Sequence, residues 1–153
     1  MTTRLAQRRS DERGQLAGIE MLPLGVLVFA VGVLFFGQLW AVIEAKSATE
    51  SAAREATRTF VESQVDAGAA EQRARSAALD VLTAAGRDSG RATVRANGPL
   101  VLDRCAPVTF EVTYSVPVVR LGFVDWGNGF EVTSSHTEIV DPYRDALDGG
   151  RCG

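Results

Sequence analysis

Histidine and cysteine are scarce in this sequence, which removes the usual ingredients of several kinds of site. His136 is the only histidine among the 153 residues, and Cys105 and Cys152 are the only cysteines. No paired-cysteine spacing typical of a zinc site occurs, and the sequence displays no companion ligands for a metal at His136. It also contains no P-loop and no nucleophile elbow. We therefore expect no catalytic residues, no metal and no cofactor.

Basic residues do not form a patch in the body of the chain. The sequence carries 16 Lys and Arg against 19 Asp and Glu, and the balance after the first thirteen residues is acidic. A protein that binds nucleic acid needs clustered basic side chains to neutralise phosphates. We therefore expect no nucleic acid among the partners.

Formal charge is absent from residues 21–43, a run of 23 residues of which 14 are Leu, Ile, Val or Phe. A helix of that length spans about 34 Å, enough to cross a bilayer core. A buried soluble helix would normally show polar interruptions, and the apolar core of a cleaved secretory signal is usually about 7–15 residues long. The run therefore predicts a single transmembrane helix, with the lipid bilayer as its partner.

The flanks of this run predict its orientation. Four arginines lie in the first thirteen residues, whereas 12 basic and 16 acidic residues follow Ile43. By the positive-inside rule, the N-terminus stays in the cytoplasm of the cell and the C-terminal part is extracytoplasmic. A disulfide persists in such a compartment, so a bridge between Cys105 and Cys152 is expected. Free thiols and an intermolecular bridge are the alternatives.

Two helical stretches follow the apolar run. Small side chains repeat at spacings of three and four from Ala41 to Phe60, which predicts that the helix continues out of the membrane from Ala41 to Glu62. The stalk is assigned to residues 44–67, with Gly68 as the residue that breaks it. A second helix is expected from Ala69 to Ala85, with Gly86 at its C-terminal cap. Its small face comprises Ala70, Ala74, Ala77, Ala78, Val81 and Ala85. We expect this face of the second helix to pack inside the chain. For the stalk, packing inside the chain and helix packing between chains are both open.

Beyond Gly90 the pattern changes from helix to strand. The stretch "VTFEVTYSVPV" alternates apolar and polar residues, as a half-buried strand does, and "RATVRA" and "FEVTSSHTEIV" are its expected neighbours. Turns are predicted at Asn97-Gly98-Pro99 and at Gly127-Asn128-Gly129. His136 shares a strand face with Phe130 and Val132, which favours a hydrogen-bonded structural histidine.

These elements predict an α+β fold with a long N-terminal transmembrane and stalk helix, a second helix and a small three-stranded antiparallel sheet. The predicted organisation has four parts. They are a basic cytoplasmic tail at 1–20, the transmembrane helix at 21–43, the stalk at 44–67 and a small exported α+β domain at 68–153.

Three stretches together carry a family resemblance: "GQLAGIEMLPLGVLVF", "AKSATESAAREATRTFVE" and "SSHTEIVDPYR". Over most of residues 13–144 they resemble TadE-like pseudopilins of the tight-adherence (Flp-type) pilus assembly group, of the kind seen in actinobacterial chains. The resemblance implies a pilin-like fold and a minor pilus component or assembly factor of a pilus or related secretion system, without catalytic activity. It also implies partnership with other pilin-like or pilus-assembly subunits and with a prepilin peptidase.

The resemblance gives Glu20 a candidate role in assembly. In the pilin-like group a peptidase cuts after a glycine, and a glutamate at the fifth mature position aligns the subunit with its neighbours, where it can pair with an N-terminal amine. Cleavage after Gly14 makes Gln15 the terminus and Glu20 the sixth residue, whereas cleavage after Gly18 makes Glu20 the second. Neither register matches the fifth position. The alternative is that Glu20 lies at the headgroup level, where a carboxylate costs little.

The leading functional hypothesis is a membrane-anchored pseudopilin that associates through its transmembrane helix and stalk. Gly25 and Gly32 lie seven residues apart on one helix face and allow close approach in lipid, and Ala45 and Ala52 continue the small face into the stalk. The alternative is a single-pass, membrane-anchored extracytoplasmic binding module whose sheet captures a partner. An anchored enzyme is a third hypothesis, against which the missing catalytic constellation counts.

Overall fold

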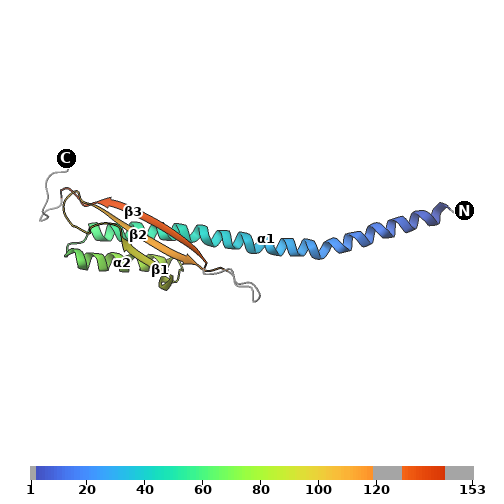
Figure 1. Cartoon of the computed structure of the whole chain (residues 1–153), viewed down its shortest axis with the longest axis horizontal. Coiled ribbons are helices and arrows are strands. Elements are labelled where there is room, and N and C mark those ends of the chain that lie inside the picture. Colours follow the sequence, from blue (N-terminus) through green and yellow to red (C-terminus); the bar gives the residue numbers. More distant parts are fainter. Residues whose placement is uncertain (1–2, 119–128, 144–153) are drawn as a thin grey trace. The chain divides into compact units, whose positions relative to one another are not determined.

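A computed structural model describes residues 3–118 and 129–143 of the chain. By its internal contacts the chain divides into two compact units, residues 1–39 and residues 40–153. The fold is α+β, as the sequence predicts (Figure 1). Its elements in chain order are α1 (Thr3–Val61), α2 (Ala67–Ala84), the 3-10 helix η1 (Ser89–Arg91), β1 (Ala92–Ala96), β2 (Pro107–Val116) and β3 (Phe130–Ile139).

The first unit consists of the N-terminal part of α1, which runs through Pro23 without ending. From Met21 onward this part is long and apolar enough to cross a membrane, with a mean hydropathy of 2.4 over its most apolar window. None of that window is buried within the chain, and the large side chains of Phe29 and Phe36 are 73% and 68% exposed. Exposure of this surface to water is unfavourable, because each apolar side chain in contact with water costs free energy.

The second unit contains a three-stranded antiparallel sheet in the order β1-β2-β3. The register aligns Val94 with Val112 and Val112 with Ser134. Every second residue of β2, from Val108 to Val116, is buried, which confirms the alternation predicted from the sequence. Val118, placed in the same run by the sequence pattern, lies beyond the end of the strand.

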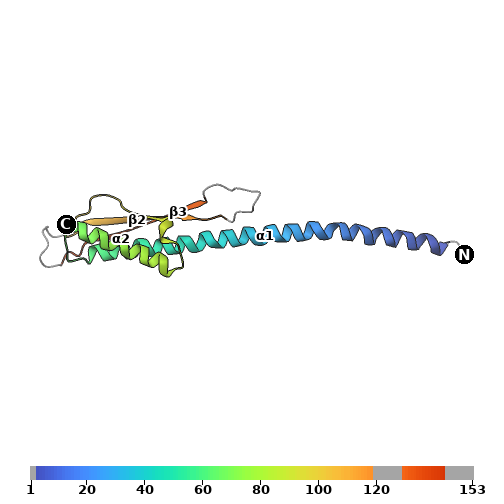
Figure 2. The ribbon, with the colours of Figure 1, turned by 90° about the horizontal axis from the view of Figure 1, so that it is seen from below.

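Both helices of the second unit cover the same face of the sheet (Figure 2). The core therefore lies between one layer of helices and one layer of strands. The rings of Phe60 on α1 and Phe110 on β2 lie 5.7 Å apart at its centre. Alanines supply most of the helical side of the core, so the helix backbones approach the sheet closely. The buried helical residues are Ala48, Ala52, Ala53, Ala56, Phe60, Ala70, Ala74, Ala78 and Leu82.

The end of α1 agrees with the predicted helix but not with the predicted break. The helix ends at Val61, one residue before Glu62, and the assignment of the break to Gly68 is wrong. Asp66 is the N-terminal cap of α2, where its side chain accepts a hydrogen bond from Ala69 N at 3.1 Å. Gly68 therefore lies in the first turn of α2, because an Asp side chain satisfies the free amides of a new helix well.

The far end of α2 follows the prediction more closely. Gly86 has a φ of 71°, and the amides of Gly86 and Arg87 donate to Thr83 O and Leu82 O, both at 2.9 Å. This pair of hydrogen bonds is a Schellman motif, which confirms Gly86 as the terminating residue. Ala85, which was expected on the buried face, is exposed because the helix ends at Ala84. Leu82 is the buried residue in the last turn.

Turn residues connect the strands. Gly98 has a φ of 107°, as a glycine in the predicted turn at Asn97-Gly98-Pro99 permits. Gly129 has a φ of 97°, and a Cβ at this position would lie 2.3 Å from Val116 O. The other residues of the second predicted turn, Gly127 and Asn128, lie outside the described part of the chain.

Candidate membrane and assembly sites

The predicted processing and packing residues of the first unit all lie on α1. Gly14, Gln15 and Glu20 are part of its helical backbone. At Gly25 and Gly32 an added Cβ would meet nothing within 4 Å. No other described element of this chain covers that glycine face, so it is open to lipid or to another helix.

The two predicted packing residues of the stalk lie elsewhere. Ala45 and Ala52 are both fully buried inside the second unit. Ala52 belongs to the main core, and Ala45 packs with Tyr114, Val116 and Val132 of the sheet. Of the two interpretations left open by the sequence, packing inside the chain is the one that the structure shows for Ala45 and Ala52. The sheet needs a helical cover, and this face of α1 supplies it.

A row of polar contacts joins α1 to β3, and we call it the polar seam: Lys46, Thr49, Thr57, Ser134 and His136. Lys46 Nζ donates to Thr133 O at 2.6 Å and lies 3.0 Å from Ser134 Oγ. Thr49 Oγ1 lies 2.8 Å from Ser134 Oγ and donates to Lys46 O at 2.9 Å. Thr49 is fully buried and Ser134 nearly so, and both are satisfied by these bonds.

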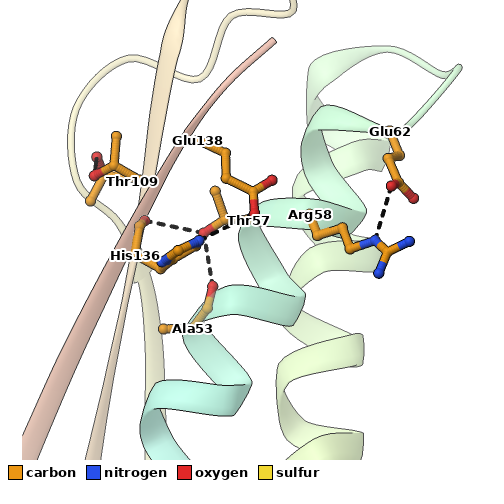
Figure 3. Close-up of polar contacts among 8 residues, drawn as sticks. Ala53, Thr57, Arg58, Glu62, Thr109, His136 and Glu138 are labelled. Atoms are coloured by element: carbon orange, nitrogen blue, oxygen red, sulfur yellow. Dashed lines mark hydrogen bonds and ion pairs between the residues drawn. The ribbon is translucent and has the colours of Figure 1, made fainter. Parts of the chain in front are cut away.

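The seam continues toward the end of α1 (Figure 3). Thr57 Oγ1 lies 2.8 Å from Ala53 O and 3.2 Å from His136 O, so the buried hydroxyl bridges helix and strand. His136 Nε2 lies 3.2 Å from Glu138 Oε1. The expectation of a hydrogen-bonded histidine is therefore confirmed. Phe130, assigned to the same face, is 52% exposed at the start of the strand.

An exposed ion pair lies next to the seam (Figure 3). Arg58 Nε donates to Glu62 Oε1 at 2.9 Å, and both side chains are more than 60% exposed. The hydrogen bond to Glu62, followed by the negative charges of Glu62 and Glu55, raises the pKa of Arg58 above its usual value. Arg58 therefore stays charged throughout the working pH range.

Each outer strand of the sheet accepts a hydrogen bond from a long basic side chain on one of the helices. Lys46 from α1 donates to Thr133 O of β3, and Arg75 from α2 donates to Val94 O of β1. Glu71 holds Arg75 in place one helical turn away. Neither role follows from the local sequence. Lys46 is the only lysine in the chain, which distinguishes it from the other basic residues. Nothing in the sequence, however, pairs it with residue 133.

The start of the second unit carries a further polar cluster, which we call the Trp40 cluster: Trp40, Glu44 and Arg87. Trp40 Nε1 donates to Glu44 Oε1 at 2.9 Å, and Arg87 Nη2 donates to Glu44 Oε2 at 2.7 Å. The Arg87 side chain is 17% exposed, whereas that of Glu44 is 53% exposed. The cluster joins α1 to the loop after α2, and no local sequence pattern pairs Glu44 with Arg87.

Cys105 lies at the end of the loop before β2. It has a positive φ of 65°, and its amide donates to Val140 O at 3.0 Å. Cys152 lies outside the described residues, so the bridge between them stays a prediction. Within residues 3–118 and 129–143, no group of three or more His, Cys, Asp or Glu side chains is arranged to hold a metal ion.

Comparison of this chain with protein families, with characterised proteins and with solved structures finds no match. The inference of function therefore depends on the residues and on the geometry described above.

Proposed function

We propose that this protein is a single-pass membrane subunit of a tight-adherence or related pilus or secretion system, acting as a minor pseudopilin or assembly factor. One observation supports this most directly. A single helix, α1, carries an apolar segment that the chain does not cover and then supplies one side of the core of a small α+β unit. This is the architecture of a subunit that is anchored and displayed by the same helix.

The uncovered segment needs a partner. Side chains from Met21 to Ile43 are mostly exposed, and the described remainder of the chain supplies nothing that packs on the window of highest hydropathy. Lipid tails cover such a surface, and so does a second apolar helix. The proposed function needs both, lipid while the subunit is anchored in the bilayer and a neighbouring helix once it associates. The open faces of Gly25 and Gly32 fit the second step.

The orientation in this proposal has a cytoplasmic N-terminus and an extracytoplasmic second unit. The four arginines before the span support it through the positive-inside rule. Glu20 is then the acid at the cytoplasmic mouth of the span, where it pairs with the N-terminal amine of a neighbouring copy or pilin-like subunit. Pairing removes two charges from the bilayer at once.

A second candidate function is a membrane-anchored binding module. The observation in its favour is the outer face of the sheet, which is polar and uncovered by described residues. Thr109 and Thr137 pair through their hydroxyls at 2.7 Å, and Thr113 and Thr133 do so at 3.0 Å. Such a face, rich in hydroxyls, suits a polar ligand outside the membrane. Under this alternative Glu20 has no role in association between chains.

Glu20 variants test the leading proposal. We expect Glu20→Ala to insert normally, because removing a charge makes the span more apolar. Crosslinking between copies in the membrane, or recovery in a pilus fraction, should fall while the amount of membrane-bound protein stays level. Glu20→Gln should fail nearly as badly, since an amide keeps the shape but does not neutralise an amine.

Glu12→Ala is the matched control, because Glu12 is acidic and precedes the span. It should assemble like the parent. If both Glu20 variants also assemble like the parent, the carboxylate has no part in assembly and the binding-module alternative gains. The intact mass of the membrane-extracted protein shows whether the chain is cut after Gly14 or after Gly18.

A further inference from the structure

The end of the sheet at which β2 finishes and β3 begins lies beside the start of the second unit. Val116 of β2 pairs with Phe130 of β3 at this end. Val116 is fully buried in a cluster with Ala45, and Ala41 and Val42 of α1 pack against that cluster. This end of the sheet therefore contacts the turn of α1 in which the uncharged run finishes.

The contacts between β3 and α1 place Phe130 along the helix. The strand runs in the same direction as α1 (Figure 1), with Thr49 bonded to Ser134 and Thr57 to His136. Phe130 precedes Ser134 by four residues, which is about 13 Å of strand or the rise of about nine helical residues. Counting back from Thr49, Phe130 lies at the level of about residue 40 of α1.

Large apolar side chains are exposed at this level. Trp40, Ile43 and Phe130 are all more than half exposed. Trp is also a residue type that gathers at membrane interfaces. In the sequence, the 13 residues between Val116 and Phe130 include six that are Val, Leu, Phe or Trp and only two that are charged. That composition favours contact with lipid over contact with water.

Chain continuity fixes where the bilayer surface meets the second unit. If residues 21–43 span the membrane, the interfacial layer of the bilayer begins where the uncharged run ends, just before Glu44 and Lys46. A typical helix tilt of about 20° shifts a point about 10 Å from the helix axis by roughly 3 Å. That shift is smaller than the roughly 5–7 Å thickness of one interfacial layer. Phe130 therefore reaches the same layer as the end of the run.

We propose that the end of the sheet at Phe130 is a second membrane contact, in which the Phe130 ring enters the interfacial layer of the lipid bilayer. A unit carried on one helix can tilt relative to the membrane, and a contact to one side of the helix axis restricts that tilt. The second unit is then held in one orientation on the bilayer surface. The inference depends on the proposed function only in requiring that residues 21–43 span the membrane.

Fluorescence quenching in the full chain tests the proposal. Phe130→Cys is labelled with an environment-sensitive fluorophore and reconstituted into phosphatidylcholine vesicles in which some lipids carry a nitroxide at the top of the acyl chain. Ile139→Cys is the matched control, because Ile139 is exposed on the same strand about 30 Å farther along. We expect blue-shifted, quenched emission from position 130 and no quenching at position 139. The parent chain without an added cysteine measures the background.

A second probe keeps the Phe130 side chain in place. Glu131→Cys puts the fluorophore on the exposed neighbour of Phe130. Adding Phe130→Glu should remove most of the quenching at position 131, because a carboxylate is disfavoured in contact with lipid tails. Adding Ile139→Glu instead should leave the quenching unchanged. Circular dichroism shows that each variant is folded, as expected for changes at exposed positions.

Equal quenching at positions 130 and 139 would overturn the proposal. Quenching at position 131 that a folded Phe130→Glu variant leaves unchanged would overturn it too. Either result, in a chain that alkaline carbonate does not extract from the vesicles, leaves the proposed function standing. A chain that carbonate removes from the vesicles would instead remove the function and this inference together.

Discussion

Lys46 Nζ donates to the backbone carbonyl of Thr133 at 2.6 Å, from the side of the sheet on which β3 has no neighbouring strand. An edge strand of ten residues is a template for pairing with another chain, and a lysine placed against it is one way in which proteins prevent this. The contact therefore has two effects. It joins α1 to the sheet and it occupies part of an exposed edge.

Removing the lysine should expose that edge. We expect Lys46→Met, which keeps most of the aliphatic stem, to increase self-association of the purified chain and to lower its stability by about 1 kcal/mol, since the bond is largely exposed. Analytical ultracentrifugation in detergent measures the association. Arg54→Met, at an exposed position on the same helix, is the control and should stay unchanged. Equal association of both variants and the parent would mean that Lys46 does not protect the edge.

The burial of Ala52 predicts intolerance of larger side chains. Ala52→Leu should destabilise the second unit by about 1–3 kcal/mol, because extra methyl groups have no space between α1 and the sheet. Glu50→Leu, two residues earlier and exposed, should have little effect on stability. Thermal unfolding followed by near-UV circular dichroism compares them. If instead Ala52→Leu left stability unchanged and reduced association between chains, the alanine face would be an intermolecular one.

The predicted bridge between Cys105 and Cys152 has a stability signature. Cys152→Ser should lower the unfolding midpoint by several degrees under non-reducing conditions, as about 2–4 kcal/mol does in a small domain. A chain-entropy contribution is expected, because the bridge would close a long loop between the start of β2 and the C-terminus. The parent in reducing buffer is the control and should melt like the variant. A midpoint that neither change moves would argue against a bridge.

Topology is tested by labelling. A cysteine placed at Ser89, in η1, should react with a membrane-impermeant thiol reagent added to intact cells, whereas one at Ser10 should not. The parent chain without an added cysteine measures the background. The opposite labelling pattern would mean that the chain has the reverse orientation and that the second unit is not extracytoplasmic.

Local sequence patterns were enough to predict the elements. The alternation of apolar and polar residues from Val108 to Val116 determines a strand with one buried face. The uncharged run from Met21 determines a helix that is long and apolar enough to cross a membrane. Gly86 marks the end of α2 because few other residues adopt a positive φ at no cost. Each of these follows from the conformational preference or the polarity of neighbouring residues.

Contacts between distant residues were decided only by the tertiary structure. The small face of α1 is equally suited to a sheet and to another helix, and in the structure it packs on the buried face of the sheet. The same applies to Lys46 with Thr133, 87 residues apart, and to Glu44 with Arg87, 43 residues apart. Long flexible side chains form such contacts only once the folded backbone has brought the two residues together. No local sequence pattern therefore predicts these contacts.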